Sequence, residues 1–216
     1  MKNSGEVVYF DVLPSTSATS IETTRKLSSE NIPEVHHYVL FECQNDTITY
    51  LERVFKNIKV NTLYAPKPST EDECFYFSAV EALAKEHGIL LKTYQAQEYI
   101  AFKESKVYIT QIYSADKSSL PIFSIEFQGE KHMYLAQGCI DTYSFDPIMN
   151  LMQECQSVIY GAKGEEKQEF LNISYLPSKI KTLIVSNENN YVDEEFLTSF
   201  IKSKKVYFSP ERISLK

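Results

Sequence analysis

A chain of 216 residues, of which 43% are hydrophobic, can bury a full core, and we expect one domain spanning residues 1–216. No apolar run approaches the ~20 residues of a membrane-spanning helix, so no membrane insertion is expected from this segment. The formal net charge of −7 argues against a general binder of nucleic acids, because neutralising phosphates requires a basic surface. We therefore expect weak or no direct nucleic-acid binding.

Strands and helices alternate in the first half of the chain, where the spacing of apolar residues switches between 2 and 3.6. Strands are predicted at 6–13, 34–41, 59–66 and 89–95, and helices at 20–31, 47–57 and 71–88. Gly88 is the predicted cap at the end of the third helix, because glycine readily adopts the left-handed backbone that ends many helices.

The middle of the chain is rich in strands. Strand structure is predicted over 98–113, 121–137, 181–187 and 205–209, with a turn at Gln128–Gly129 and helices at about Tyr143–Cys155 and Asp193–Ser203. Since strand–helix alternation flanks a strand-rich middle, we expect an α+β fold. Its predicted architecture is a four-layer αββα sandwich, in which two mixed sheets are flanked by helices.

The segment Tyr38–Phe55 reads YVLFECQNDTITYLERVF, an apolar strand followed by a polar turn and an amphipathic helix. Functional sites are often built where a strand end meets a helix start. The turn contains no histidine, no glycine-rich cradle and no nucleophile with a visible base. The turn therefore predicts no catalytic residue and no cofactor-binding residue by itself.

Four segments carry a resemblance to a known family. YFDVL at 9–13 stands where its members have a strand ending in LIDxG, and FECQNDT at 41–47 stands where they have THxHxDH. IFSIEFQGEKHMYLAQGC matches the SLVLxxxxxxxxLLTGD hairpin, and VIYGAKGE matches LKVxHHGS. Over about residues 6–216 the chain thus resembles the metallo-β-lactamase fold family, and within it the soluble domain of the bacterial competence protein ComEC.

The resemblance implies a metal site from which most ligands have been lost. Members need three or four histidine or anionic ligands for each zinc ion. Asp46 is the one ligand retained in the first motif, and we expect it to be partly buried and paired with Lys163 in place of a dication. The vestigial positions are Glu42, Gln44, Asp46, Thr47, Cys139, Ala162 and Lys163.

With these replacements the resemblance implies a catalytically inactive domain with a structural or interaction role in DNA uptake, no cofactor and no enzyme activity. The alternative is a metal-dependent phosphodiesterase or nuclease. In that case Glu42, Asp46, Cys139 and Asp141 would form a rebuilt site for a divalent metal such as zinc or manganese, since all four are competent ligand types.

ComEC-type proteins are polytopic membrane channels. The resemblance therefore implies that the partner is the channel portion of the same or a related protein. It also implies that the chain is a fragment of a larger membrane protein, or a truncated relative, tethered to the outer face of the bacterial membrane. A complete chain would instead be cytoplasmic.

The four histidines have structural interpretations. His36 and His37 are neighbours in a predicted strand, so we expect one on each face of the sheet, as a packed and a surface imidazole. His87 is expected to serve the end of a helix, and His132 lies in a predicted hairpin.

Overall fold

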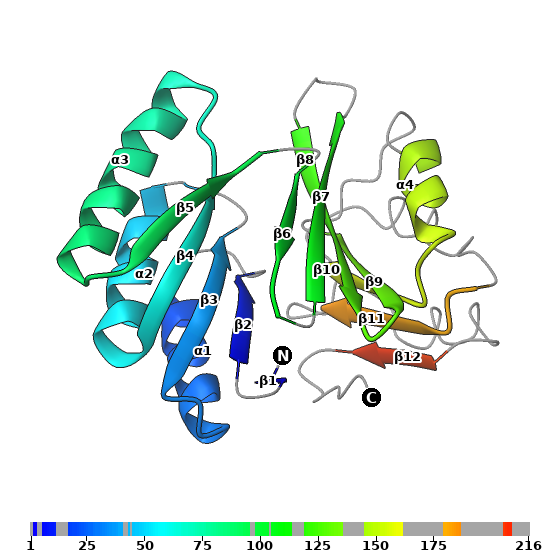
Figure 1. Cartoon of the computed structure of the whole chain (residues 1–216), viewed down its shortest axis with the longest axis horizontal. Helices are drawn as coiled ribbons and strands as arrows, with labels where there is room; N and C mark the ends of the chain where they lie inside the picture. Colours follow the sequence, from blue (N-terminus) through cyan, green and yellow to red (C-terminus); the bar gives the residue numbers. More distant parts are fainter. Residues whose placement is uncertain are drawn as a thin grey trace. The chain divides into compact units, whose positions relative to one another are not determined.

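The computed structural model describes residues 2–3, 6–11, 17–40, 43, 45–95, 98–103, 105–113, 119–135, 145–161, 179–186 and 205–208. The chain divides into two compact units, Met1–Gln95 and Ala96–Lys216, and each contains one sheet (Figure 1). We describe each unit by itself. The expectation of a single domain over residues 1–216 stays a prediction.

The first unit contains a sheet of five described strands in the order β1-β2-β3-β4-β5. Strand β1 is antiparallel to β2, whereas β2 to β5 run parallel, so the sheet is mixed. Helices α1, α2 and α3 connect successive parallel strands, as βαβ units require. The elements are β1 (Lys2–Asn3), β2 (Glu6–Asp11), α1 (Ser17–Ser29), β3 (Glu34–Leu40), α2 (Asn45–Asn57), β4 (Lys59–Pro66), α3 (Glu71–Glu86) and β5 (Leu90–Tyr94).

Local signals set the ends of helix α3. Thr70 accepts a hydrogen bond from the amide of Glu73, whose carboxylate accepts one from the Thr70 amide, which is a complete capping box. Gly88 follows the helix with a φ of 68°, and its amide donates to the carbonyl of Lys85. The predicted glycine cap is confirmed.

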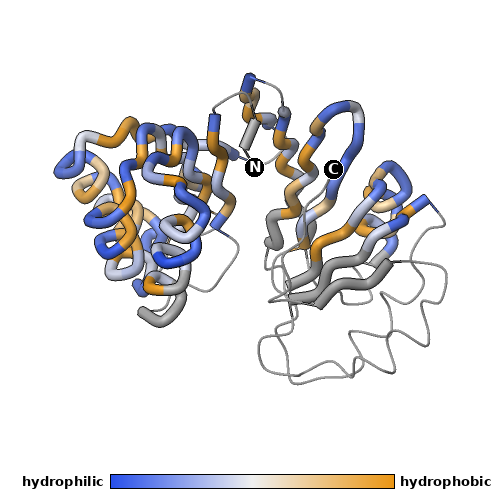
Figure 2. The backbone as a smooth tube through the Cα atoms, turned by 90° about the horizontal axis from the view of Figure 1, so that it is seen from below, coloured by the Kyte–Doolittle hydropathy of each residue, from blue (hydrophilic) through white to orange (hydrophobic). Residues whose placement is uncertain are grey.

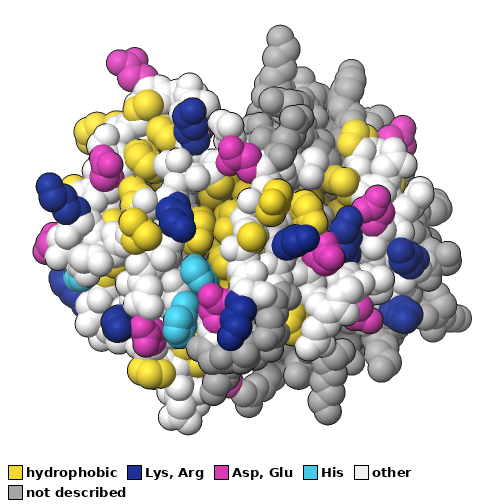
Figure 3. Space-filling model, in the orientation of Figure 1, with side chains coloured by type: hydrophobic (Ala, Val, Ile, Leu, Met, Phe, Trp, Pro, Cys, Tyr) yellow, Lys and Arg dark blue, Asp and Glu magenta, His cyan; other side chains and the backbone are white. Residues whose placement is uncertain are grey.

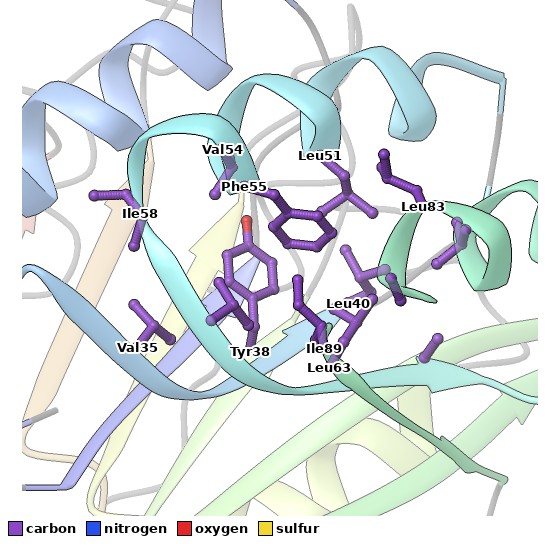
Figure 4. Close-up of a cluster of buried hydrophobic side chains, with 14 of the residues drawn as sticks. Val35, Tyr38, Leu40, Leu51, Val54, Phe55, Ile58, Leu63, Leu83 and Ile89 are labelled. Carbon is purple, nitrogen blue, oxygen red and sulfur yellow. The ribbon is translucent and has the colours of Figure 1, made fainter. Parts of the chain in front are cut away.

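The core of the first unit lies between its sheet and its helices. Tyr38, Leu40 and Leu63 from the strands meet Leu51 and Phe55 from α2, and all five are buried (Figure 4). Burying each such side chain stabilises the fold by about 1.5–3 kcal/mol. Along the helices of this unit, hydrophilic and hydrophobic segments alternate, as amphipathic helices require (Figure 2).

The second unit contains a sheet of seven described strands in the order β12-β11-β10-β9-β8-β7-β6. Strands β9 to β12 run parallel, and β6 to β9 are antiparallel, so this sheet is also mixed. Gln128 and Gly129 join β8 to β9 with φ values of 51° and 80°, which confirms the predicted turn. The elements are β6 (Tyr99–Ala101), β7 (Ser105–Tyr113), β8 (Ser119–Phe127), β9 (Glu130–Leu135), α4 (Phe145–Met152), β10 (Ser157–Gly161), β11 (Thr182–Ser186) and β12 (Lys205–Phe208).

The predicted α+β fold with two mixed sheets and helices is confirmed, with corrections at the ends of elements. Helix α1 begins at Ser17 rather than residue 20. Helix α4 is shorter than predicted and carries Pro147 in its first turn, where proline is tolerated. Strand β10 was not among the predicted strands. The helix expected at Asp193–Ser203 lies outside the described residues.

Two surface features bear on function. On the face shown in Figure 3, lysines and arginines are interspersed with acidic side chains, and no purely basic patch of described residues lies there. Among the helices that the structure describes, none is long and apolar enough to cross a membrane.

Candidate functional site at the carboxyl end of the first sheet

The segment between β3 and α2 carries the residues that the sequence resemblance aligns with the first metal motif. Strand β3 ends at Leu40 and α2 begins at Asn45, so the predicted strand and helix are both present. Asp46 is exposed in the first turn of α2, where its negative charge interacts favourably with the positive end of the helix dipole. The expectation that Asp46 is partly buried is wrong. The side chain of Thr47 is fully buried, and Glu42 and Gln44 lie outside the described residues.

A buried carboxylate holds the two elements on either side of this turn. Asp11 is the last residue of β2 and is paired with Leu40, the last residue of β3. The Tyr38 hydroxyl donates to Asp11 Oδ2 at 3.1 Å, and the Tyr50 hydroxyl donates to Asp11 Oδ1 at 3.2 Å. Since Tyr38 belongs to β3 and Tyr50 to α2, the carboxylate connects both elements to β2.

The network extends to the first helix. The two tyrosine hydroxyls lie 2.8 Å apart, and Thr23 Oγ1 of α1 lies 3.2 Å from the Tyr50 hydroxyl. The Tyr9 hydroxyl lies 3.2 Å from the same Thr23 oxygen. Such a buried network stabilises the fold when its groups are satisfied, and it fixes the relative position of the elements that contribute to it.

A further tyrosine holds the end of β3. The hydroxyl of Tyr94, the last residue of β5, donates a hydrogen bond to the Leu40 carbonyl, immediately before the turn. The strand before the turn is therefore held by Tyr94 and Asp11, and the helix after it by Asp11.

Burial, followed by the nearby charge of Asp11, raises the pKa of both network tyrosines. The pKa of Tyr38 and that of Tyr50 lie well above their usual value. Both hydroxyls therefore stay protonated near neutral pH and act as hydrogen-bond donors. This chemistry suits a structural support, and neither hydroxyl is placed to supply a phenolate base.

The other positions that the sequence resemblance assigns to the metal site follow two neighbouring parallel strands of the second unit. Leu135, the last residue of β9, pairs with Tyr160 of β10, so both strands end at the same edge of the sheet. Cys139 comes after β9, and Ala162 and Lys163 come after β10 in the sequence, but all three lie outside the described residues. Their convergence with Asp46, and the ion pair expected between Lys163 and a carboxylate, stay predictions.

His36 and His37 each have a partner on β2. His36 Nδ1 accepts a hydrogen bond from the Val7 amide at 3.2 Å. His37 Nε2 lies 2.8 Å from the Glu6 carboxylate, and the His37 ring packs near Tyr64. These contacts join β2 to β3 and fit the structural interpretation of both histidines.

His132 and Ser157 form a buried pair at the amino end of β10, away from the strand ends that precede the vestigial positions. His132 Nδ1 lies 2.7 Å from Ser157 Oγ, and burial lowers the pKa of His132. Nearby Cys155 is also buried, which raises the pKa of its thiol to about 11 and leaves it protonated. A neutral thiol is a weak nucleophile, so Cys155 is a core residue.

The pKa of His132 predicts a pH dependence of stability. The unfolded chain binds a proton at His132 at a higher pH than the folded chain does, so stability should fall as the pH drops below about 6.5. The loss should stop at the lower pKa of the folded state. Urea unfolding at several pH values should show a smaller loss for His132→Gln than for the unsubstituted protein. Identical pH dependence in the two proteins would contradict this assignment.

The described part of the first motif does not fit a zinc ion. Zinc ligands must converge on one point, but Asp46 faces solvent while Thr47 is fully buried. Thr47 also carries a hydroxyl, which is not among the usual zinc ligands. Within the parts of the chain that the structure describes, no group of three His, Cys, Asp or Glu residues could hold a metal ion.

No protein-family model and no curated protein sequence matches the chain. Several solved structures, in contrast, are similar to it. The metallo-β-lactamase fold protein YhfI from Bacillus subtilis superposes with a TM-score of 0.65 at 12% identity, covering 96% of this chain and 86% of YhfI. The chain has the metallo-β-lactamase fold.

Two further solved structures are similar at comparable identity. A diphosphatase from the PhnP family gives a TM-score of 0.58 at 12% identity, covering 99% of this chain and 80% of that one. The short form of human tRNase Z gives a TM-score of 0.53 at 10% identity, covering 100% of this chain and 90% of that one. Likeness at such low identity establishes the fold alone, so function depends on the residues at the site.

Proposed function

We propose that the chain is a catalytically inactive metallo-β-lactamase-fold domain with a structural or interaction role. The observation that carries the proposal is Thr47, which stands at a histidine position of the family motif and has a fully buried side chain. A buried hydroxyl cannot replace an imidazole that reaches a metal ion. Asp46 remains beside it as an exposed carboxylate without a converging neighbour among the described residues of the same motif.

The chemistry of the fold makes this loss decisive. Two of the similar structures are described as a diphosphatase and a tRNase, so the fold can carry enzymes that act on phosphate compounds. Metal-dependent hydrolysis needs a Lewis acid to polarise the substrate and lower the pKa of bound water. Glu42, Gln44 and Thr47 in place of histidines, with Ala162 and Lys163 in place of the histidine pair of HHG, weaken any such site.

A second candidate is a metal-dependent phosphodiesterase or nuclease with a rebuilt site. The exposure of Asp46 favours it, because an exposed carboxylate is available to a metal ion. The further ligands would be Glu42, Cys139 and Asp141, which supply oxygen and thiolate donors of types that bind divalent metals.

The proposed setting is DNA uptake by a ComEC-type system, and it rests on the order of the sequence motifs. The inactive domain would act there as a folded module that contacts the membrane channel portion of the same or a related protein, on the outer face of the membrane. Because the chain is acidic, direct binding of nucleic acid would be weak.

The functional prediction concerns Asp46. The unsubstituted protein should not hydrolyse plasmid DNA or bis-p-nitrophenyl phosphate in the presence of zinc or manganese, and Asp46→Ala should behave identically. Glu52→Ala, which removes another exposed carboxylate of α2, is the matched control, and an active hydrolase of this fold calibrates the assay. Metal-dependent turnover that is lost in Asp46→Ala but kept in Glu52→Ala would establish the second candidate instead.

A further inference from the structure

Strands β6, β7 and β8 carry a pair of tyrosines on one face of the second sheet. The three strands are antiparallel neighbours (Figure 1), and Tyr99 of β6 lies opposite Tyr108 of β7, which lies opposite Ser124 of β8. Cross-strand partners share a face of a sheet, and so do residues two apart in a strand. Lys106 and Glu126, which are partners of each other, therefore lie in the next row of the same face. We call these five residues the tyrosine face.

The two rings of the tyrosine face meet the solvent. The side chain of Tyr99 is 61% exposed and that of Tyr108 is half-buried. Their ring centroids lie 6.1 Å apart, with the ring planes tilted by 40°. Single exposed apolar residues are ordinary, but apolar groups that adjoin one another on a surface often mark a binding site.

The ring of Tyr108 is held in place by its neighbours. Its hydroxyl donates a hydrogen bond to Glu126 Oε2 at 2.9 Å, and Lys131 Nζ lies 5.5 Å from the ring centroid. Lys131 is itself paired with Glu154. The tyrosine face is thus oriented before any ligand binds, which reduces the entropy lost on binding.

Ser124 supplies a buried polar group beside the rings. The residue is only 7% exposed, and among the hydrogen bonds of the described residues none involves its hydroxyl. A buried hydroxyl without a partner is unfavourable, so a ligand that offers a hydrogen bond there regains the lost free energy.

The charges beside the rings are nearly balanced. Lys106 and Glu126 are cross-strand partners, and Lys131 pairs with Glu154. Lys103, which follows β6, adds one positive charge. A strongly charged ligand would therefore find little net charge of the opposite sign here.

Two further glutamates near these strands belong to the other face. Glu130 pairs with Phe127 and directly precedes Lys131, which pairs with Glu126. The carbonyl of Glu98 accepts a hydrogen bond from the Ile109 amide, so the pairing of β6 with β7 continues to Glu98. Since successive residues of a strand alternate between faces, neither carboxylate joins the tyrosine face.

We propose that the tyrosine face binds a neutral carbohydrate. The C–H face of a sugar ring carries partial positive charge and stacks on the negative face of an aromatic ring. The sugar hydroxyls then reach Ser124, Lys106 and Glu126 around the rings. A shallow site of this kind binds weakly, with a dissociation constant on the order of 1 mM. The proposal does not depend on the proposed function, since its test measures binding and not hydrolysis.

A proline-rich peptide is the rival ligand, because such peptides also pack on aromatic side chains. They dock into grooves between the rings, however. Centroids 6.1 Å apart are typical of rings in contact with each other, which leaves no slot for a proline between Tyr99 and Tyr108. The geometry therefore favours a ligand that lies flat across the rings.

Titration of the whole chain, followed by the amide signals in two-dimensional NMR spectra, tests the proposal. The probes are cellotetraose, maltotetraose and chitotetraose, each added up to about 10 mM, which exceeds the expected dissociation constant. At least one of them should bind and shift the amide signals of Tyr99, Tyr108 and Ser124. Because the tyrosine face is nearly neutral, raising the salt concentration should leave the affinity unchanged to within about twofold.

Three variants separate the contributions to binding. Tyr99→Ala should weaken binding at least about fivefold, whereas Tyr99→Phe, which keeps the ring, should stay within about twofold. Ser124→Ala should weaken it about threefold, because the hydrogen bond is lost. Phe75→Ala, which removes another exposed aromatic ring on α3, is the matched control and should leave the affinity unchanged. Circular dichroism checks that each variant is folded.

Three results would overturn the proposal. The first is that none of the three oligosaccharides binds, which includes the case where an octaproline peptide binds in their place. The second is binding that Tyr99→Ala leaves intact, which would locate the site elsewhere. The third is an equal loss in Tyr99→Phe and Tyr99→Ala, which would exclude stacking on the ring.

Discussion

Replacing Asp11 with Ala is expected to lower the free energy of unfolding by about 3 kcal/mol, because two buried tyrosine hydroxyls lose their acceptor. Asp11 is only 4% exposed and accepts hydrogen bonds from Tyr38 and Tyr50, both of which are fully buried. The change also leaves a small cavity between β2 and α2. Urea denaturation followed by circular dichroism measures the loss.

Asp11→Asn is the matched control, because it keeps the shape of the side chain and one acceptor oxygen. Its amide group replaces the second acceptor with a donor, so the expected loss is smaller, at about 1–2 kcal/mol. If Asp11→Ala were no less stable than the unsubstituted protein, the carboxylate would not hold β3 and α2 in place.

Leu63→Ala is expected to lower the free energy of unfolding by about 3 kcal/mol, because it removes a fully buried side chain from a packed core. Leu63 lies in β4, which is flanked by β3 and β5, and its side chain has no exposed surface. Leu90→Ala makes the same chemical change in β5, where the leucine is 56% exposed. That control should change stability by less than about 0.5 kcal/mol.

Both leucine variants can be measured together by urea denaturation. Equal losses in Leu63→Ala and Leu90→Ala would contradict the packing shown in Figure 4, in which Leu63 belongs to a buried cluster that also contains residues of α2 and α3.

The parts of the fold that local chemistry determines were predictable from the sequence. The amphipathic spacing of Leu51, Val54 and Phe55 predicts α2, and all three side chains are buried. The helix cap at Gly88 and the turn at Gln128–Gly129 were predictable, because glycine readily adopts the positive φ that both features require. Strand β10 (Ser157–Gly161) was not predicted, because its segment was read only as the counterpart of a family motif.

The support beneath the candidate site was not predictable in the same way. Asp11 lies in an apolar strand, and nothing near it in the sequence marks it as a buried acceptor. Tyrosine is common in half-buried strands and ordinary in helices, so Tyr38 and Tyr50 do not stand out as its donors. Their hydrogen bonds join residues that are 27 and 39 positions apart, and no local pattern records such contacts. The exposure of Asp46 was also mispredicted, because its burial depends on how α2 packs.

The metal content of the purified protein tests the central claim most directly. The protein is incubated with excess zinc or manganese, freed of unbound metal by gel filtration and analysed by inductively coupled plasma mass spectrometry. An inactive domain without a ligand set should retain less than about 0.1 metal ion per chain, whereas a functional site of this kind retains about one or two. A stoichiometric metal ion that Asp46→Ala releases and Glu52→Ala retains would contradict the proposal that the site has lost its metal.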